Sequence, residues 1–246
     1  MTGMRIGLGL CLVFTIVQSA PAQLLSRSVG SRLHSPASAA SSSSPSLFDA
    51  VDPAVRGDVI AVVQKPTITA RHSEEPFTAN PTVYKWLLEH PDRTALAWER
   101  IGVPCLPIKE RSAGSYQFKD DSGTDVSWQA VGTIPDGRIW YATGKVKPGM
   151  LMPTVPVKAV AVVRYPATAP LNGKVAVAPT VSLYFQTDSR TTSTILRMAG
   201  PAAPRMADEG AEQLLFFFSG MARYLDKHPD QTAALLSPPR KAVGTK

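Results

Sequence analysis

The chain has very little cysteine and none of the short motifs typical of common enzyme classes. Of its 246 residues, only Cys11 and Cys105 are cysteines. Gly-x-Ser-x-Gly, His-Glu-x-x-His, the phosphate-binding loop and Cys-x-x-Cys are all missing. Serine, histidine and aspartate occur without a spacing that pairs a nucleophile with its base. The sequence therefore predicts no catalytic residues, no metal ligands and no cofactor, and it favours a protein that is not an enzyme.

Dense clusters of basic residues are also missing. The chain carries 26 Lys and Arg against 19 Asp and Glu, a net charge of +7. The longest basic clusters are Lys145/Lys147 and Arg240/Lys241, and no aromatic residues alternate with them. This pattern argues against nucleic acid as a partner. The basic balance instead favours anionic surfaces, such as those of a cell envelope.

Only one apolar run has the features of a targeting segment, and it is too short to span a bilayer. Arg5 precedes the apolar run Ile6–Val17, and Ala20-Pro21-Ala22 supplies the small-x-small pattern of a cleavage site. We interpret residues 1–22 as a signal peptide that is cleaved after its last residue. A lipoprotein signal at Cys11 is disfavoured by the large residue before it, and a transit peptide by the compact apolar core. The predicted location is periplasmic or extracellular.

Composition divides the rest of the chain into a spacer, one domain and a tail. Residues 23–57 are rich in serine, alanine and proline and cannot bury enough apolar surface to offset their chain entropy. We predict a flexible spacer there. Residues 58–230 carry the periodic apolar patterns and are expected to fold as a single α+β domain. Residues 231–246 are expected to form a basic C-terminal tail.

The first part of the predicted domain has the pattern of a strand followed by two helices. The apolar run 59–63 predicts a short strand that continues at 67–70. Asn80 is a good N-cap for the first helix. Pro91 separates this helix from a second one, which Gly102 ends.

The middle of the chain predicts antiparallel strands. Residues 124–134 alternate, with Val126 and Trp128 on one face. The turn Pro135-Asp136-Gly137 predicts that residues 138–147 return as the hairpin partner. Three further strands are expected at 115–118, 157–165 and 175–186, the last with an edge or a bulge at its proline.

A long amphipathic helix is expected to close the domain, from about Arg205 to Lys227. Its apolar stripe consists of Ala207, Ala211, Leu214, Phe218, Met221, Ala222 and Leu225. Phe216 falls on the polar side of this helix, so we expect its ring to be exposed.

This order of elements is that of the helix-grip fold. Residues 58–230 therefore resemble the START-like superfamily of lipid-transfer domains, hydrophobic-ligand binders and polyketide cyclases. The stretch from Trp140 to Gly149 is also similar to a group of exported bacterial proteins of unknown function. The resemblance implies an α+β fold, in which a curved antiparallel sheet grips the long C-terminal helix and two short helices follow the first strand. It also implies a cavity under that helix for a hydrophobic small molecule or lipid.

Trp128, Phe218 and Met221 are the large apolar side chains that we expect to line such a cavity. A second interpretation is that they fill an ordinary core, in an envelope-associated interaction or structural protein. A third is a pocket-type hydrolase or cyclase. A cavity of at least a few hundred Å³, roughly the size of known ligand pockets, separates the first interpretation from the second. Titratable groups inside the cavity would favour the third.

One local sequence occurs twice. Residues 87–95 resemble residues 225–233, and both copies contain His-Pro-Asp-x-Thr-Ala after a helical leucine. The paired histidines and aspartates would suit a metal if the two copies met in space. Histidine at a helix C-terminus, proline as a helix breaker and aspartate as a cap explain the pattern more simply. We interpret both copies as helix boundaries.

Overall fold

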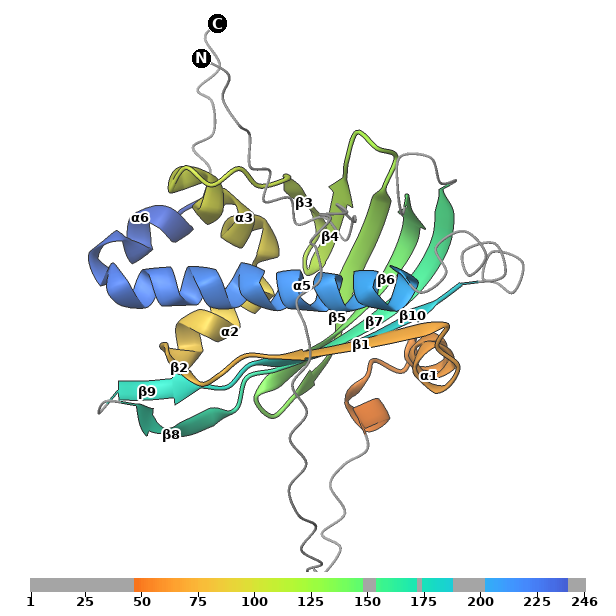
Figure 1. The fold of residues 1–246 in the computed structure, drawn as a ribbon, viewed down its shortest axis with the longest axis horizontal. Helices are drawn as coiled ribbons and strands as arrows, with labels where there is room; N and C mark the ends of the chain where they lie inside the picture. Colours follow the sequence, from red (N-terminus) through yellow and green to blue (C-terminus); the bar gives the residue numbers. More distant parts are fainter. Residues whose placement is uncertain (1–46, 148–153, 172–173, 188–201, 239–246) are drawn as a thin grey trace, which may run out of the picture.

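The computed structural model describes residues 47–147, 154–171, 174–187 and 202–238 (Figure 1). The predicted signal peptide, most of the predicted spacer and the Arg240/Lys241 cluster lie outside these residues. None of the helices in this part of the chain combines the length and apolarity needed to span a bilayer.

Two antiparallel sheets form the body of the molecule. The larger one contains β1 (Ile68–Ser73), β3 (Ile108–Ser112), β4 (Ser115–Lys119), β5 (Asp125–Ile134), β6 (Gly137–Val146), β7 (Val155–Arg164) and β10 (Thr180–Gln186). Its strand order is β1-β10-β7-β6-β5-β4-β3. The smaller sheet contains β2 (Phe77–Thr78), β8 (Ala167–Leu171) and β9 (Lys174–Val177), in the order β2-β9-β8.

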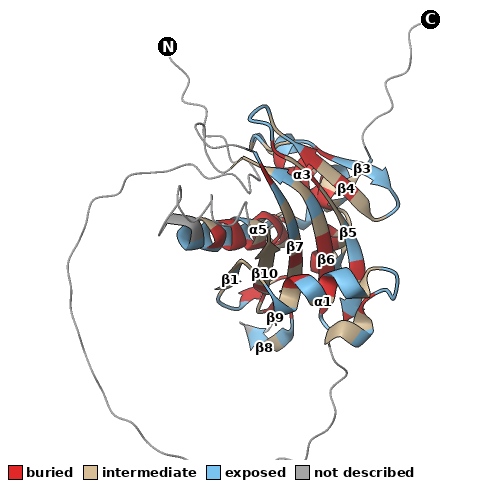
Figure 2. Ribbon diagram, turned by 90° about the vertical axis from the view of Figure 1, so that its right-hand side faces the viewer, coloured by how far each residue is buried: buried red, intermediate tan, exposed pale blue. Residues whose placement is uncertain are grey.

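Helices cover both faces of the larger sheet. They are η1 (Leu47–Ala50), α1 (Arg56–Gln64), α2 (Pro81–Glu89), α3 (Pro91–Arg100), α5 (Ala202–Lys227), η2 (Pro229–Gln231) and α6 (Thr232–Leu236). The long helix α5 crosses one face, with α2, α3 and α6 around its C-terminal half (Figure 1). Helix α1 lies on the opposite face (Figure 2). We call the two sides the α5 face and the α1 face.

Alternate residues of the central strands belong to two separate cores. In β6, Trp140 packs in the core under α5, whereas its neighbours Ile139 and Tyr141 pack in the core under α1. In β7, Val163 and Val162 divide in the same way. Burial on both faces explains why β7 is almost continuously apolar. The fold is the predicted α+β helix-grip arrangement, with an additional helix on the far side of the sheet.

The predicted strand at 59–63 is wrong, because these residues belong to α1. A short apolar run does not distinguish a strand from one buried turn of helix. Val59 and Val62 are three residues apart and are both fully buried against the α1 face. The predicted continuation at 67–70 overlaps the first half of β1, residues 68–70.

The predicted strand 175–186 is interrupted. Residues 174–177 form β9 in the small sheet, and residues 180–186 form β10 in the large one. Pro179 lies between the two strands, where its missing N–H costs neither ladder a hydrogen bond. The proline thus marks a change of sheet rather than a bulge within one strand.

The described fold extends beyond the bounds 58–230 at both ends. Val51 follows η1, is 2% exposed and forms a bridge with Gly132 of β5. This places the end of the predicted spacer within the core under α1. At the other end, α6 buries Leu235, and Arg100 donates a hydrogen bond to the Leu235 carbonyl at 2.5 Å. The first part of the predicted tail is therefore a helix docked against α3.

Local signals are confirmed where a cap or a turn decides the structure. The Asn80 side chain accepts a hydrogen bond from the Thr82 N–H at 2.9 Å and caps α2. Gly102, with φ of +84°, follows the end of α3. In the hairpin between β5 and β6, Asp136 takes a φ of +52°, a conformation that aspartate tolerates better than most residues. Phe216 is 42% exposed, as its helical position predicts.

Candidate functional site

An apolar cavity of about 100 Å³ lies between the α5 face of the sheet and helix α5. Strands β4, β5, β6, β7 and β10 contribute its floor and walls, and the middle of α5 covers it in part, so that one side stays open to solvent. Its lining consists of Pro91, Phe118, Val126, Trp128, Trp140, Ala142, Ala159, Ala161, Leu183, Phe185, Gly210, Gln213, Leu214 and Phe218.

Small side chains on two neighbouring strands create this space. Trp140 of β6 lies opposite Ala161 of β7, and Ala142 lies opposite Ala159. These alanines line the cavity, whereas Val163, next on the same face of β7, packs in the core under α5. Because side chains on one strand face repeat every two residues, three small residues on adjacent strands leave a hollow between larger ones.

Aromatic rings form much of the wall. Trp140 and Phe218 approach with their ring centroids 5.5 Å apart and their planes inclined by 39°. Phe218 also meets Phe217 edge-on at 4.8 Å. On the other side, Trp128 packs against Tyr116 at 5.8 Å. These ring pairs fix the wall in place, because tilted and edge-on contacts at such distances are favourable.

The lining has almost no polar character. Gln213 is the single amide or hydroxyl side chain among the described lining residues, and it is exposed at the surface of α5. No titratable side chain belongs to that lining. General acid–base chemistry inside the cavity has no group to perform it in this part of the chain.

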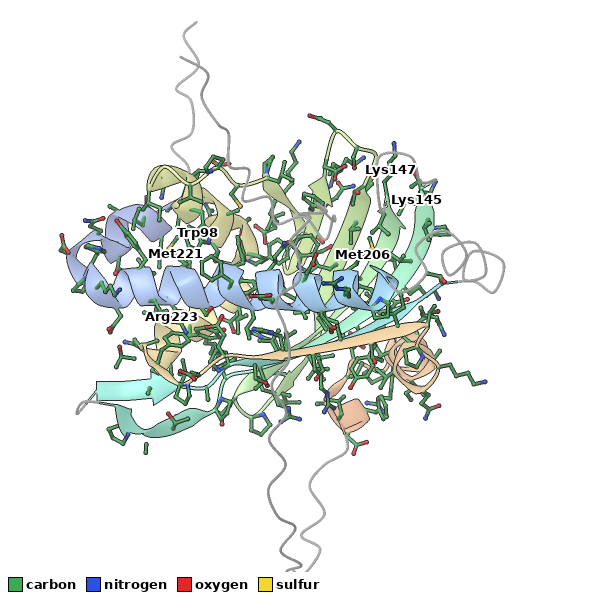
Figure 3. All side chains as sticks on the ribbon, viewed as in Figure 1. Trp98, Lys145, Lys147, Met206, Met221 and Arg223 are labelled. Atoms are coloured by element: carbon green, nitrogen blue, oxygen red, sulfur yellow. The ribbon has the colours of Figure 1, made fainter. Side chains whose placement is uncertain are left out.

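Two of the three predicted ligand-binding residues line the cavity. Trp128 and Phe218 belong to its wall, from β5 and α5 respectively. Met221 does not: it is completely buried in the core under α5. Figure 3 shows Met221 toward the C-terminal half of α5, at the level of Trp98. Ligand binding by any of the three stays a prediction.

Sequence reasoning missed the residues that make the cavity hollow. Ala142, Ala159 and Ala161 carry no signal individually, because alanine is common in strands and helices alike. A signal appears only when strands β6 and β7 are aligned, since small residues then lie on adjacent strands of one face. The same alignment would also identify Trp140 as a lining residue, because it pairs with Ala161.

Away from the cavity, α5 takes part in a partly buried polar cluster around Glu74, which lies in the loop between β1 and β2. Ser219 is completely buried on α5, and its hydroxyl donates to Glu74 Oε1 at 2.5 Å. Arg223, one turn further on, donates to Glu74 Oε2 at 2.7 Å, and its guanidinium lies 4.1 Å from the centroid of the Phe77 ring. One carboxylate thus ties the helix to the loop after β1. Arg223 lies on the side of α5 nearest α2 in Figure 3.

Tyr84 of α2 lies fully buried near this cluster, and its hydroxyl has no hydrogen-bond partner among the described residues. Burial raises the pKa of its phenol, and the negative charge of Glu74 raises it further. Its ring packs against those of Phe77 and Tyr165, at centroid distances of 6.3 and 5.3 Å. The phenol therefore stays neutral and serves the core as an aromatic ring.

The corner between α2 and α3 is fastened to the sheet next to the cavity wall at Pro91. The Tyr116 hydroxyl of β4 donates to the Glu89 carbonyl at 2.7 Å. Burial raises the pKa of Tyr116 to about 12, and the charge of Asp92 contributes to the shift. Arg138 of β6 forms an ion pair with the Glu89 carboxylate. These contacts hold the corner against β4 and β6.

The two His-Pro-Asp copies adopt the same backbone conformation at two helix boundaries. His90 has φ and ψ of −131° and 64°, and His228 has −129° and 60°. Each follows a helix and precedes a helix that begins at a proline, α3 in the first copy and η2 in the second. Each histidine ring also packs against an aromatic ring four residues earlier. Within the described ranges, no group of three or more His, Cys, Asp or Glu side chains is placed to hold a metal ion. The geometry is that of paired helix boundaries.

Basic residues near the end of β6 are interspersed with acids. Lys145 lies opposite Asp125 in the β5–β6 pair, and Lys119 forms an ion pair with the same carboxylate at 2.7 Å. Figure 3 shows Lys145 and Lys147 together at that end of the sheet. The predicted contact with an anionic envelope surface stays a prediction.

No family model matches the sequence, and no curated protein is similar to it. Solved structures with similar folds include a conserved protein from Geobacillus kaustophilus, with 13% identity over 65% of this chain and 96% of that one, at a TM-score of 0.39. Ara h 8.0201 shares 11% identity over 65% and 99% of the two chains, at 0.34. Norcoclaurine synthase from Thalictrum flavum shares 12% over 60% and 86%, at 0.30. These likenesses are too distant to bear on ligand or activity.

Proposed function

We propose that this protein binds a hydrophobic small molecule in the cavity between the α5 face and helix α5. The observation that supports the proposal is an apolar hollow of about 100 Å³ under helix α5, partly open to solvent. Protein interiors are close-packed, and voids larger than a water molecule are few. Apolar side chains that line such a hollow and face water cost about 25 cal/mol per Å² of exposed apolar surface. A bound apolar molecule would offset that cost.

The cavity is smaller than the few hundred Å³ that would by themselves separate a ligand binder from a filled core, so the proposal depends on its apolar lining. If it binds a ligand, the volume favours a small molecule over a whole lipid. Pockets for drug-sized ligands occupy about 300–1,000 Å³, and this cavity is well below that range. A whole lipid would exceed the enclosed space and extend from the open side into solvent. Element order and the position of the cavity support a relation to the hydrophobic-ligand binders of the START-like superfamily, and we include that relation in the proposal.

The test is native mass spectrometry of the full chain, after exposure to a mixed pool of apolar compounds and followed by solvent extraction. The wild-type chain should carry one apolar adduct per molecule. Ala161→Leu fills the floor of the cavity and should abolish the adduct. Ala61→Leu is the matched control, because Ala61 is exposed on α1 at the opposite side of the sheet. This variant should retain the adduct.

Bare protein in every sample would overturn the ligand proposal. It would support the interaction or structural protein with a filled core instead. An adduct that survives in Ala161→Leu would place the ligand elsewhere on the molecule.

We also propose that the protein is exported. The support is the sequence alone, where a basic residue, an apolar run and a small-x-small site precede the spacer. N-terminal sequencing of the mature protein should give a first residue of Gln23. An intact N-terminus on protein recovered from the cell interior would refute export.

A further inference from the structure

We propose that the cavity accepts a compact, uncharged molecule built on a single small ring system, and not an extended acyl chain or an anion. This inference rests on the proposed function and narrows the class of ligand. It draws on three properties of the described lining, namely its volume, its charge and its aromatic walls.

Volume limits the part of the ligand inside the hollow, which is open on one side, to about one small ring. The cavity measures about 100 Å³, and an apolar engineered cavity of about 150 Å³ accommodates benzene. The wall cannot easily recede, because Trp140 and Phe218 pack against each other and Phe218 packs against Phe217. The floor is equally fixed, since Ala159 and Ala161 sit on a strand paired along both edges.

Charge is excluded by the lining. None of the described lining side chains is charged, and their polar groups are the Gln213 amide at the surface and the indole N–H groups of Trp128 and Trp140. The backbone at the floor is occupied in the β6–β7 ladder, where Ala142 pairs with Ala159 and Trp140 with Ala161. An ion in this space would lose its hydration without gaining a partner.

Aromatic walls favour a ring over a chain of the same carbon number. Rings line the cavity from both layers, with Trp128 and Trp140 on the sheet and Phe218 on α5. Aromatic side chains contact another ring favourably in offset or edge-on geometry, beyond the effect of area burial. A flexible chain gains no such contact, and it loses conformational freedom when it folds into a compact space.

The experiment uses the full chain labelled with ¹³C at alanine methyls, since Ala142, Ala159 and Ala161 are built-in probes of the floor. Four probes form matched pairs: toluene against n-heptane, which both have seven carbons, and benzyl alcohol against benzoate, which differ in charge. Toluene and benzyl alcohol should shift the three methyl signals saturably and leave Ala61 unchanged. n-Heptane and benzoate should bind at least tenfold more weakly. Ala161→Leu should abolish the shifts, and Ala61→Leu should preserve them.

The outcomes separate this inference from the proposed function. If n-heptane shifts the same methyls at concentrations similar to or lower than those of toluene, the cavity binds apolar chains. The proposed function then stands and the ring assignment fails. Binding of benzoate as tight as that of benzyl alcohol would also overturn the assignment. If no apolar probe shifts any of the three methyls, both proposals fail together.

Discussion

Replacing Glu74 tests whether the buried polar cluster anchors α5 on the loop after β1. The hydroxyl of Ser219 is completely buried and donates to Glu74 at 2.5 Å, so Glu74→Ala leaves it without that partner. An unsatisfied buried donor costs about 1–3 kcal/mol. Arg223 is 39% exposed, so the loss of its ion pair adds only about 0.2–1 kcal/mol. We expect Glu74→Ala to lower the free energy of unfolding by about 1–4 kcal/mol.

Urea unfolding of the full chain, followed by tryptophan fluorescence, measures this loss as a lower midpoint at an unchanged slope. Ser219→Ala alone should cost about 1–2 kcal/mol. The double variant should lose less than the sum of the two, because the second change removes the group that the first left unpaired. Glu75→Ala is the control, since Glu75 is exposed, and it should stay within about 0.5 kcal/mol of wild type. Additive losses, or an equal loss in the control, would refute the anchor.

Three further predictions concern the sheet and its turns. Burial disfavours the charged form of Asp120, but hydrogen bonds from the turn that follows outweigh this effect and lower the pKa of its carboxyl group. Asp120→Asn should therefore lower the free energy of unfolding by about 1 kcal/mol at pH 7. This loss should shrink below about pH 4 in unfolding measurements made across a pH series. A pH-independent loss would contradict the carboxylate's role. Because burial raises the pKa of Tyr116 to about 12, the unfolded chain loses that proton first, at about pH 10, and stability should fall from there toward pH 12. Tyr116→Phe, which removes the hydrogen bond to Glu89, should lessen that alkaline fall, and an unchanged profile would argue against it. At Gly144, an added Cβ would lie 2.2 Å from a backbone oxygen of β5, so Gly144→Ala should cost about 1–3 kcal/mol in urea unfolding. Gly57→Ala, with open space around the new Cβ, should be neutral or stabilising by up to about 1 kcal/mol, and equal losses in the two would refute the steric argument.

Residues close together in the sequence decided much of this fold. Asn80 and Pro81 fix the start of α2, because a side-chain acceptor and a preset φ act within one turn. The two-residue connection between β5 and β6 follows from a proline and an aspartate that tolerate the turn geometry. The apolar stripe of α5 predicted both its buried face and the exposure of Phe216. These features were predictable because their causes lie within a few residues of one another.

The sequence did not decide whether a short apolar segment would form a helix or a strand, or which sheet a strand would join. Residues 59–63 form a helix because the α1 face of the sheet offers Val59 and Val62 a surface at helical spacing. The strand predicted across Pro179 divides because its two halves find different sheets. Neither outcome follows from local propensity, since both depend on the partner that the rest of the chain supplies.

The candidate site likewise depends on tertiary packing rather than on local sequence. Phe218 and Met221 share one stripe of α5, yet Phe218 lines the cavity and Met221 packs wholly within the core. Met221 lies three residues further along the helix, past the end of the cavity. The hollow itself exists because strand register brings Ala142 next to Ala159 and Ala161 opposite Trp140. The sequence determined which side chains are small, and only tertiary packing placed them together, because a cavity is a property of the space between elements.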